Sequence, residues 1–180
     1  MPPPGRAFKG SPWRRAREGF ALRVEVRDAV PEDLDELTEL WKALAVEGSP
    51  GDLVLFPPTD ENATRWRSWA LSVIRSEGGG ILVAEAGGEL VGFVLFAERE
   101  SALKSPYRRA VIYDLYVKPE WRRKGVATRL MGAALERLKA KGIDLVTVSV
   151  AASNQVAFKL YKKLGFQEFM LTLFKRLVRR

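Results

Sequence analysis

Apolar and polar residues alternate along some parts of this chain and recur every three to four residues along others. The segment from Leu22 to Arg27 alternates with the period of two that is typical of a half-buried strand. Two apolar runs, residues 81–86 and 89–98, flank the pair Gly87-Gly88, and this arrangement predicts a β-hairpin. The first half of the chain therefore contributes at least three strands.

Four other stretches have the spacing of an amphipathic helix, with apolar residues gathered on one face. Their ends follow from a proline in a first turn, from serine or asparagine caps, and from glycines that stop a helix. Four helices are predicted: one that begins at Pro31, one from about Asp60 to Ser76, one from Gly125 to Gly142, and one from Ser153 or Asn154 to Gly165.

Three further apolar segments predict strands in the second half of the chain, at residues 110–117, 143–150 and 166–178. The first of them is apolar on both faces except at Asp114, which is typical of a central strand that is covered on both sides. The complete order is β-α-α-β-β-β-α-β-α-β. This order predicts an α/β fold of the α+β type, a mixed sheet with helices on both faces.

Composition limits the chain to one folded domain and excludes several kinds of chemistry. With 180 residues and 47% apolar content, it can bury one sizeable core, which we place in residues 22–180 after a flexible basic extension of residues 1–21. The chain has no cysteine and no histidine, which excludes zinc sites built on them, thiol nucleophiles and Ser-His triads. We expect no metal, so acid–base chemistry must use Asp, Glu, Tyr, Lys, the backbone or water.

The formal net charge of +8 suits an anionic ligand. Much of the excess lies at the chain ends, where charge runs are usually solvated, and no alternation of aromatic and basic residues indicates a nucleic-acid surface. No apolar run is long enough to span a bilayer, and residues 1–20 lack the apolar region of a secretory signal. We therefore expect a cytoplasmic protein that does not bind membranes.

An internal basic cluster, Arg122-Arg123-Lys124, lies between the predicted strand ending at Val117 and the predicted helix beginning near Gly125. The start of a helix leaves backbone N–H groups unpaired and carries partial positive charge, so this junction suits a phosphate group. The Walker pattern and the dinucleotide-binding Gly-x-Gly-x-x-Gly pattern are both absent.

The remaining pattern, Arg122-x-x-Gly125-x-Ala127, resembles the acyl-CoA pyrophosphate loop of the GNAT superfamily of N-acyltransferases, which reads Gln/Arg-x-x-Gly-x-Gly/Ala. Two neighbouring segments strengthen the resemblance, which covers the chain from about Leu22 onward. The segment Leu115-Tyr116-Val117-Lys118-Pro119 fits the strand and turn that precede the loop in the family, and the later family motif is matched by Asn154, Ala157, Tyr161 and Gly165-Phe166.

The resemblance implies a GNAT-like fold, with a central sheet of about six or seven strands that splays at the cofactor cleft. It also implies acetyl-CoA as co-substrate, with no metal, and direct attack of a primary amine on the thioester in a ternary complex. The pantetheine arm would pair with the strand, the diphosphate would lie on the loop, and the later motif would contact the arm. The implied cofactor-binding residues are Leu115, Tyr116, Val117, Arg122, Arg123, Lys124, Gly125, Val126, Ala127, Thr128, Asn154, Ala157 and Tyr161.

Two residues are candidates for proton transfer. Tyr161 would be the general acid, because a phenol donates well to a thiolate that is the weaker base by roughly 1.5 pK units; the competing interpretation is a core aromatic. Asp114 is the first candidate for the base, since a carboxylate in an apolar strand is costly unless it is paired or functional.

Asp114 has a second interpretation, as a structural hydrogen-bonding residue. Many relatives have a glutamate one position earlier, where this chain has Tyr113, and alternation along a strand places these two positions on opposite faces. Both interpretations of Asp114 stay open, and Glu85 and Glu98 are the reserve carboxylates.

The acceptor stays open among a polyamine, an aminoglycoside, an amino acid and a protein N-terminal amine, so the partner is a small-molecule or peptide amine. Four aromatic residues either line an acceptor pocket or belong to the core: Trp41, Phe56, Trp66 and Trp69. By analogy with relatives, a homodimer is expected. The alternative functions are a non-catalytic acyl-CoA sensor and, less favoured, a basic nucleic-acid-binding protein.

Overall fold

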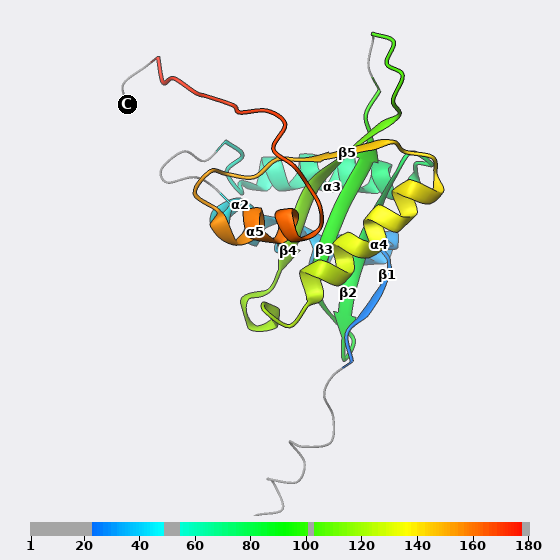
Figure 1. The fold of residues 1–180 in the computed structure, drawn as a ribbon. Helices are drawn as coiled ribbons and strands as arrows, with labels where there is room; N and C mark the ends of the chain where they lie inside the picture. The colour runs from blue at the N-terminus through cyan, green and yellow to red at the C-terminus, as the bar shows by residue number, and fades with distance from the viewer. Residues whose placement is uncertain (1–22, 49–54, 101–102, 178–180) are drawn as a thin grey trace, which may run out of the picture.

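The computed structural model describes residues 23–48, 55–100 and 103–177 of the 180-residue chain (Figure 1). The predicted extension of residues 1–21 lies outside the described residues. The strands are β1 (Glu25–Asp28), β2 (Gly79–Ala86), β3 (Glu89–Glu98), β4 (Arg109–Val117) and β5 (Leu145–Val148). The helices are α2 (Leu34–Glu47), α3 (Asp60–Arg75), α4 (Val126–Ala140) and α5 (Gln155–Lys163), with short 3-10 helices η1 (Pro31–Asp33) and η2 (Pro119–Trp121).

The described strands form one mixed sheet in the order β1-β2-β3-β4-β5. Neighbouring strands are antiparallel except β4 and β5, which are parallel. The predicted hairpin is confirmed, with β2 and β3 joined at Gly87 and Gly88, both of which have positive φ. The mixed α/β architecture predicted from the element order is therefore confirmed.

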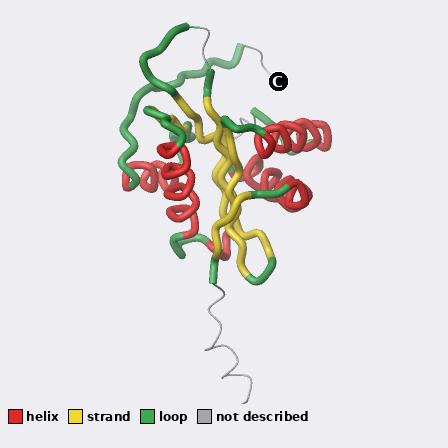
Figure 2. Tube along the Cα trace, turned by 90° about the vertical axis from the view of Figure 1, so that its right-hand side faces the viewer, coloured by secondary structure: helices red, strands yellow, loops and turns green. Residues whose placement is uncertain are grey.

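Helices cover both faces of the sheet, as the edge-on view shows (Figure 2). One core lies under α2 and α3, where Leu37 and Trp66 pack on Phe93 of β3. The other core lies under α4, where Leu130 packs with Phe96 of β3 and also with Tyr161 of α5. This division follows the period of two along the strands, because successive side chains enter opposite cores. No helix in the described ranges is long and apolar enough to cross a bilayer.

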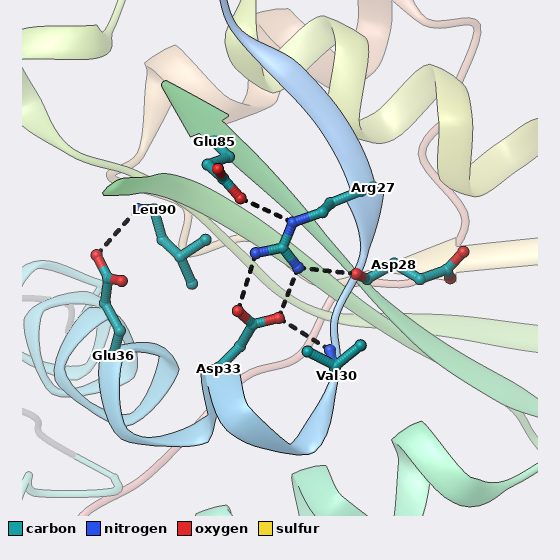
Figure 3. Close-up of polar contacts among 7 residues, drawn as sticks. All are labelled: Arg27, Asp28, Val30, Asp33, Glu36, Glu85 and Leu90. Atoms are coloured by element: carbon teal, nitrogen blue, oxygen red, sulfur yellow. Dashed lines mark hydrogen bonds and ion pairs between the residues drawn. The ribbon is translucent and has the colours of Figure 1, made fainter. Parts of the chain in front are cut away.

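A polar network joins the start of the first helical segment to the edge of the sheet (Figure 3). The Arg27 guanidinium on β1 binds both carboxylate oxygens of Asp33, at 2.7 and 2.9 Å, and its Nε donates to Glu85 of β2 at 2.8 Å. Asp33 also accepts the backbone N–H of Val30. The hydrogen bond from Arg27 holds the pKa of Asp33 below its usual value, against the opposing effect of burial. This network fixes how α2 approaches the sheet.

The prediction of about six or seven strands is wrong for the described part of the chain, where the sheet has five. The missing strand is the one predicted at residues 166–178, because residues 166–177 form no strand and run away from the sheet (Figure 1). A β-prone sequence becomes a strand only when a partner strand accepts its backbone hydrogen bonds. Several of its large apolar side chains are exposed: Phe169, Met170, Leu171, Leu173, Phe174 and Leu177.

Candidate active site

Strands β4 and β5, the last two of the sheet, separate partway along β4. They pair only from Arg109 to Ile112 on β4, opposite Leu145–Val148, whereas β4 continues to Val117. From Tyr113 to Val117 no described strand pairs with β4 on that side; we call this stretch the open edge. Alternate residues of a strand direct their backbone groups to opposite edges.

The hydrogen bonds of β3 show which backbone groups face the open edge. The N–H of Lys118, just after β4, donates to Val91 O at 2.9 Å, so Lys118 and Tyr116 direct their backbone groups toward β3. Leu115 and Val117 therefore direct theirs to the open edge, where an extended ligand would find hydrogen-bonding partners. One edge of the strand predicted to bind the cofactor is thus unpaired by any described strand, and its role in binding stays a prediction.

A β-bulge at Tyr113 changes the faces on which its neighbours lie. The register with β3 passes from Ile112 to Asp114 without a partner for Tyr113. Both Tyr113 and Asp114 then contact α3: the Tyr113 ring packs against Trp69 with centroids 5.0 Å apart, and Asp114 binds Trp66. Our expectation that these two positions face opposite sides is wrong, because a bulge inserts one residue and breaks the alternation.

Asp114 lies against an aromatic cluster on the α2–α3 face. Its Oδ2 accepts a hydrogen bond from Trp66 Nε1 at 2.9 Å, and Trp66 in turn stacks on Trp41 at 5.6 Å. Burial raises the pKa of Asp114 to about 6, and the Trp66 hydrogen bond opposes that rise. The hydrogen bond that one interpretation expected is therefore present, and the role of Asp114 as a base stays a prediction.

The aromatic residues considered for an acceptor pocket divide between core and surface. Trp41 and Trp66 are buried in the α2–α3 core, and Trp69 packs against that core. Phe56, by contrast, is largely exposed. The core interpretation is confirmed for Trp41 and Trp66.

The basic loop ends in a helix start with unpaired amide groups. Gly125 has φ +80° and is the N-cap of α4, without a side-chain cap. The first helical hydrogen bond runs from Arg129 N to Gly125 O, at 3.0 Å. The N–H groups of Val126, Ala127 and Thr128 therefore point out of the helix without a backbone acceptor, on a loop whose residues 122–125 are exposed. This is the anion-binding geometry predicted from the sequence.

The cationic side chains of this loop have different neighbours. Arg123 has φ +58°, an unusual left-handed conformation for a residue with a side chain, and Lys124 Nζ lies 4.9 Å from the centre of the Trp121 ring. Arg122 instead turns back across β4, where its Nε donates to Val117 O at 2.9 Å. The loop thus offers two cations directly to a ligand and holds the third against the strand.

Glu47, the last residue of α2, accepts hydrogen bonds from both Arg122 and Tyr116. Its carboxylate accepts from Arg122 Nη2 at 2.5 Å and from the Tyr116 hydroxyl at 3.1 Å. Burial, together with the bond to Glu47, raises the pKa of Tyr116, while Arg122 opposes the rise. Sequence reasoning missed Glu47, because no motif covers it and its distance along the chain from Arg122 hides the contact.

The later motif forms the N-terminus and the buried face of α5. Asn154 is the N-cap, and its Oδ1 accepts the N–H of Ala157 at 3.0 Å. Tyr161 is buried in the α4-side core, where its ring meets Phe166 edge-on, so the core interpretation of its ring is confirmed.

The Tyr161 hydroxyl is nevertheless not completely enclosed. Every fully buried side-chain N or O atom of the described residues has a hydrogen-bond partner, and no described residue bonds the Tyr161 hydroxyl. The hydroxyl is therefore not fully buried and makes no hydrogen bond to a described residue, while burial raises the pKa of Tyr161 and keeps the proton on the phenol.

The reserve carboxylates lie away from the open edge. Glu98 is opposite Ala110, at the other end of β4, and pairs with Arg108. Glu85 is on β2, which β3 separates from β4, and pairs with Arg27. Two surface hollows also lie elsewhere, one lined by residues that include Asp28, Gly79 and Arg137 and the other by residues of α2 with Arg67 of α3. In the described ranges, no group of three or more carboxylates is placed to hold a metal.

The geometry therefore combines three features around one end of β4. The start of α4 supplies amide groups for an anion, the open edge supplies backbone partners for an extended arm, and Asp114 and Tyr161 lie on opposite faces of the sheet. Such a site can hold a phosphate-bearing chain and present its end to proton donors and acceptors.

Comparison with solved structures gives the same fold. An aminoglycoside N-acetyltransferase in complex with CoA superposes with a TM-score of 0.70 at 19% identity, covering 88% of this chain and 97% of that one. A glucosamine-6-phosphate N-acetyltransferase from Arabidopsis thaliana superposes with a TM-score of 0.63 at 19% identity, covering 87% of this chain and 99% of that one.

Two sequence relatives are also named as acetyltransferases. An uncharacterised N-acetyltransferase of Methanocaldococcus jannaschii is 28% identical over 144 residues, which are 79% of this chain and 60% of that protein. An L-methionine sulfoximine/L-methionine sulfone acetyltransferase of Pseudomonas aeruginosa is 24% identical over 147 residues, 81% of each chain.

The family model of the acetyltransferase (GNAT) family matches residues 35–166, which span the open edge, the basic loop and α5. The resemblance seen in the three linked motifs is therefore confirmed over most of the chain: it belongs to the acetyltransferase (GNAT) family.

Proposed function

We propose that this protein is an acetyl-CoA-dependent N-acetyltransferase that transfers the acetyl group directly to a primary amine in a ternary complex. The observation that carries the proposal is the open edge of β4 next to the start of α4. An extended arm that pairs with β4 and ends in a diphosphate fits this combination. The direct route also agrees with a chain that contains no cysteine to carry an acyl group.

The residues present fit acetyl-CoA, which supplies the activated thioester. The amide groups of Val126, Ala127 and Thr128 would bind the diphosphate, with Arg122, Arg123, Lys124 and Gly125 completing the loop. The backbone of Leu115 and Val117, on either side of Tyr116, would bind the pantetheine arm. Asn154 and Ala157 would contact the arm from the start of α5. The side-chain amide nitrogen of Asn154 donates no hydrogen bond to a described residue.

Two side chains have the properties that proton transfer requires. Asp114 accepts the proton from the amine, because its pKa of about 6 leaves it ionised at neutral pH yet basic enough to accept. Tyr161 donates to the departing thiolate, because its raised pKa keeps the phenol protonated. A backbone N–H at the open edge near Leu115 stabilises the charge that develops on the thioester oxygen.

The acceptor is a small-molecule or peptide amine that enters on the α2–α3 face, where Asp114 lies. The Pseudomonas relative is named for two amino-acid analogues, and several fold neighbours are aminoglycoside acetyltransferases, one of them in complex with sisomicin. These names favour amino acids and aminoglycosides as acceptor classes, and the polyamines considered from the sequence are a third class to test.

A thiol-release assay tests the proposal. Acetyl-CoA is incubated with the protein and sisomicin, L-methionine sulfone or spermidine, and free CoA is measured. We expect amine-dependent release of CoA with at least one acceptor. Binding of CoA by calorimetry without release for any amine of a wider panel would favour the non-catalytic sensor, and no binding of CoA would refute both functions.

We also propose a homodimer formed through the C-terminal segment. Residues 169–177 carry exposed apolar side chains, and the outer edge of β5 has no described strand beside it. An apolar segment with strand propensity and an unpaired strand edge are complementary. Light scattering is expected to give twice the chain mass, and a Leu171→Lys, Leu173→Lys variant should give the mass of one chain.

A further inference from the structure

The ion pair between Arg122 and Glu47 joins the basic loop to the helix on the acceptor face. Both side chains are a little under half exposed, and their closest atoms are 2.5 Å apart. The guanidinium also lies over the Tyr116 ring, with its central carbon 5.5 Å from the ring centre. Arg122 is thus held from three sides, by Glu47, by Tyr116 and by Val117 O.

The contacts of Arg122 occupy two groups that the proposed function assigns to the binding of acetyl-CoA. Val117 O faces the open edge and would pair with the pantetheine arm, but here it accepts from Arg122 Nε. The Arg122 cation would face the diphosphate, but here it is neutralised by Glu47. To face the diphosphate, Arg122 would have to leave Glu47, and this movement would also release Val117 O to the arm.

When Arg122 leaves, Glu47 loses its counter-ion and keeps only the Tyr116 hydroxyl. The Tyr116 side chain belongs to the α2–α3 core, on the same face as Asp114. Residues two apart along a strand are separated by about 6.6 Å. The released carboxylate would therefore lie on the same face of the sheet as the candidate base, where an incoming ammonium group needs a negative partner.

We propose that Glu47 is an acceptor-positioning carboxylate that is masked by Arg122 in the free protein and released when CoA binds. The inference rests on the proposed function, because it assigns a second role to the same site. It makes binding ordered: the cofactor takes Arg122 first, and the amine then binds Glu47. If CoA binding releases Glu47 from Arg122, thermodynamic linkage requires that removing the ion pair between these residues tightens CoA binding.

Calorimetry with CoA, without any acceptor, tests the masking. Glu47→Gln is expected to bind CoA about two- to fivefold more tightly than the wild type, the range for loss of a partly exposed ion pair. Glu47→Asp, which keeps the charge but shortens the side chain, is expected to change affinity in the same direction. Thermal unfolding of each variant checks that the fold is intact.

A double-mutant cycle separates the ion pair from a general effect of charge. The second background is Arg122→Gln, because glutamine also occupies this position in the family pattern. There, Glu47→Gln should leave the CoA affinity unchanged. Glu120→Gln is the matched control, since Glu120 is exposed, lies two residues from Arg122 and has no ion pair in the described ranges. Glu120→Gln should change the CoA affinity by the same factor in the wild-type and the Arg122→Gln backgrounds.

Kinetics test the positioning role with whichever of sisomicin, spermidine and L-methionine sulfone the wild type acetylates. Glu47→Gln is expected to raise KM for the amine about tenfold while kcat changes less than threefold, since the residue positions and does not react. Glu47→Asp should recover part of the loss. Glu120→Gln should change neither constant.

The outcomes distinguish this inference from the proposed function. If the wild type binds no CoA, the proposed function fails. If the wild type binds CoA but Glu47→Gln binds it equally or less tightly, or changes affinity equally in both backgrounds, only the masking fails and the inference is overturned. The calorimetry decides this even when none of the three amines is acetylated.

Discussion

The indole Nε1 of Trp66 donates a hydrogen bond to Oδ2 of Asp114 over 2.9 Å and thereby ties α3 to β4 next to the bulge at Tyr113. This contact leaves the second carboxylate oxygen of Asp114 for another partner. Because burial raises the pKa of Asp114 to about 6, the carboxyl changes charge just below neutral pH. Its titration should therefore be visible in both activity and stability.

Asp114→Asn keeps the shape of the side chain and an oxygen that can accept from Trp66, but it removes the base. We expect kcat/KM to fall at least tenfold. In the wild type, kcat/KM should decline below about pH 6 as Asp114 is protonated, and this acid limb should be absent from the residual activity of the variant. A pH–rate profile of both proteins makes the comparison, and an unchanged acid limb would remove Asp114 from the role of base.

The same variant makes a prediction about stability. The folded pKa of Asp114 is raised above the unfolded value of 3.8, so its ionisation destabilises the fold progressively as pH rises from that value through about 6. Urea unfolding at pH 8 should show Asp114→Asn to be more stable than the wild type by about 1–3 kcal/mol. At pH 4 the advantage should nearly vanish, and an equal advantage at both pH values would contradict the prediction.

Tyr161→Phe removes the phenol proton and leaves the ring packed against Phe166. Turnover should fall at least tenfold, because the thiolate then leaves without a donor, whereas the affinity for acetyl-CoA should change little. Steady-state kinetics and calorimetry measure the two quantities separately. Unchanged turnover would leave Tyr161 as a core residue alone.

Gly125→Val tests the start of α4. A β-carbon at Gly125 would meet no atom within 4 Å, so the substitution causes no clash, but φ of +80° is strained for a β-branched residue. The chain should relieve that strain by turning the amide groups of the first turn away from the diphosphate. We expect CoA binding to be abolished while circular dichroism shows a folded protein; retained affinity would refute the role of this turn.

Gly92→Ala tests the close approach of β3 to β4. A β-carbon there would lie 2.6 Å from Tyr116 O, a backbone atom that cannot move without moving the strand of the open edge. We expect lower stability by about 1–3 kcal/mol and weaker CoA binding. Gly132→Ala is the matched control, because a β-carbon at this helical position meets nothing within 4 Å. It should stabilise the fold by about 0.5–1 kcal/mol and leave CoA binding unchanged.

The parts of the molecule that were predictable from sequence are those governed by local rules. The hairpin follows from Gly87-Gly88. The start and the end of α5 follow from its N-cap Asn154 and from Gly165, and the structure has both where the sequence predicts them. The basic loop and the start of α4 were predictable because Gly125 marks the change from strand to helix. Each of these features is determined by residues within one or two turns of the chain.

The parts that were not predictable depend on contacts across the fold. A bulge at Tyr113 leaves no mark in a run that is apolar on both faces, so the faces of Tyr113 and Asp114 were assigned wrongly. Glu47 meets Arg122 only because α2 packs beside the end of β4. The strand predicted at residues 166–178 fails for the opposite reason, because strand propensity is present but no described strand accepts it.

The parting of β4 from β5 has one further consequence. Between Tyr113 and Val117 the edge of β4 away from β3 is paired with no described strand, and an unpaired sheet edge is a site where another extended polypeptide can add and begin aggregation. A bound arm that covers this edge would protect the native state against such self-association. It would also raise the melting temperature in proportion to the logarithm of ligand concentration, so the substrate would serve as the protein's own stabiliser.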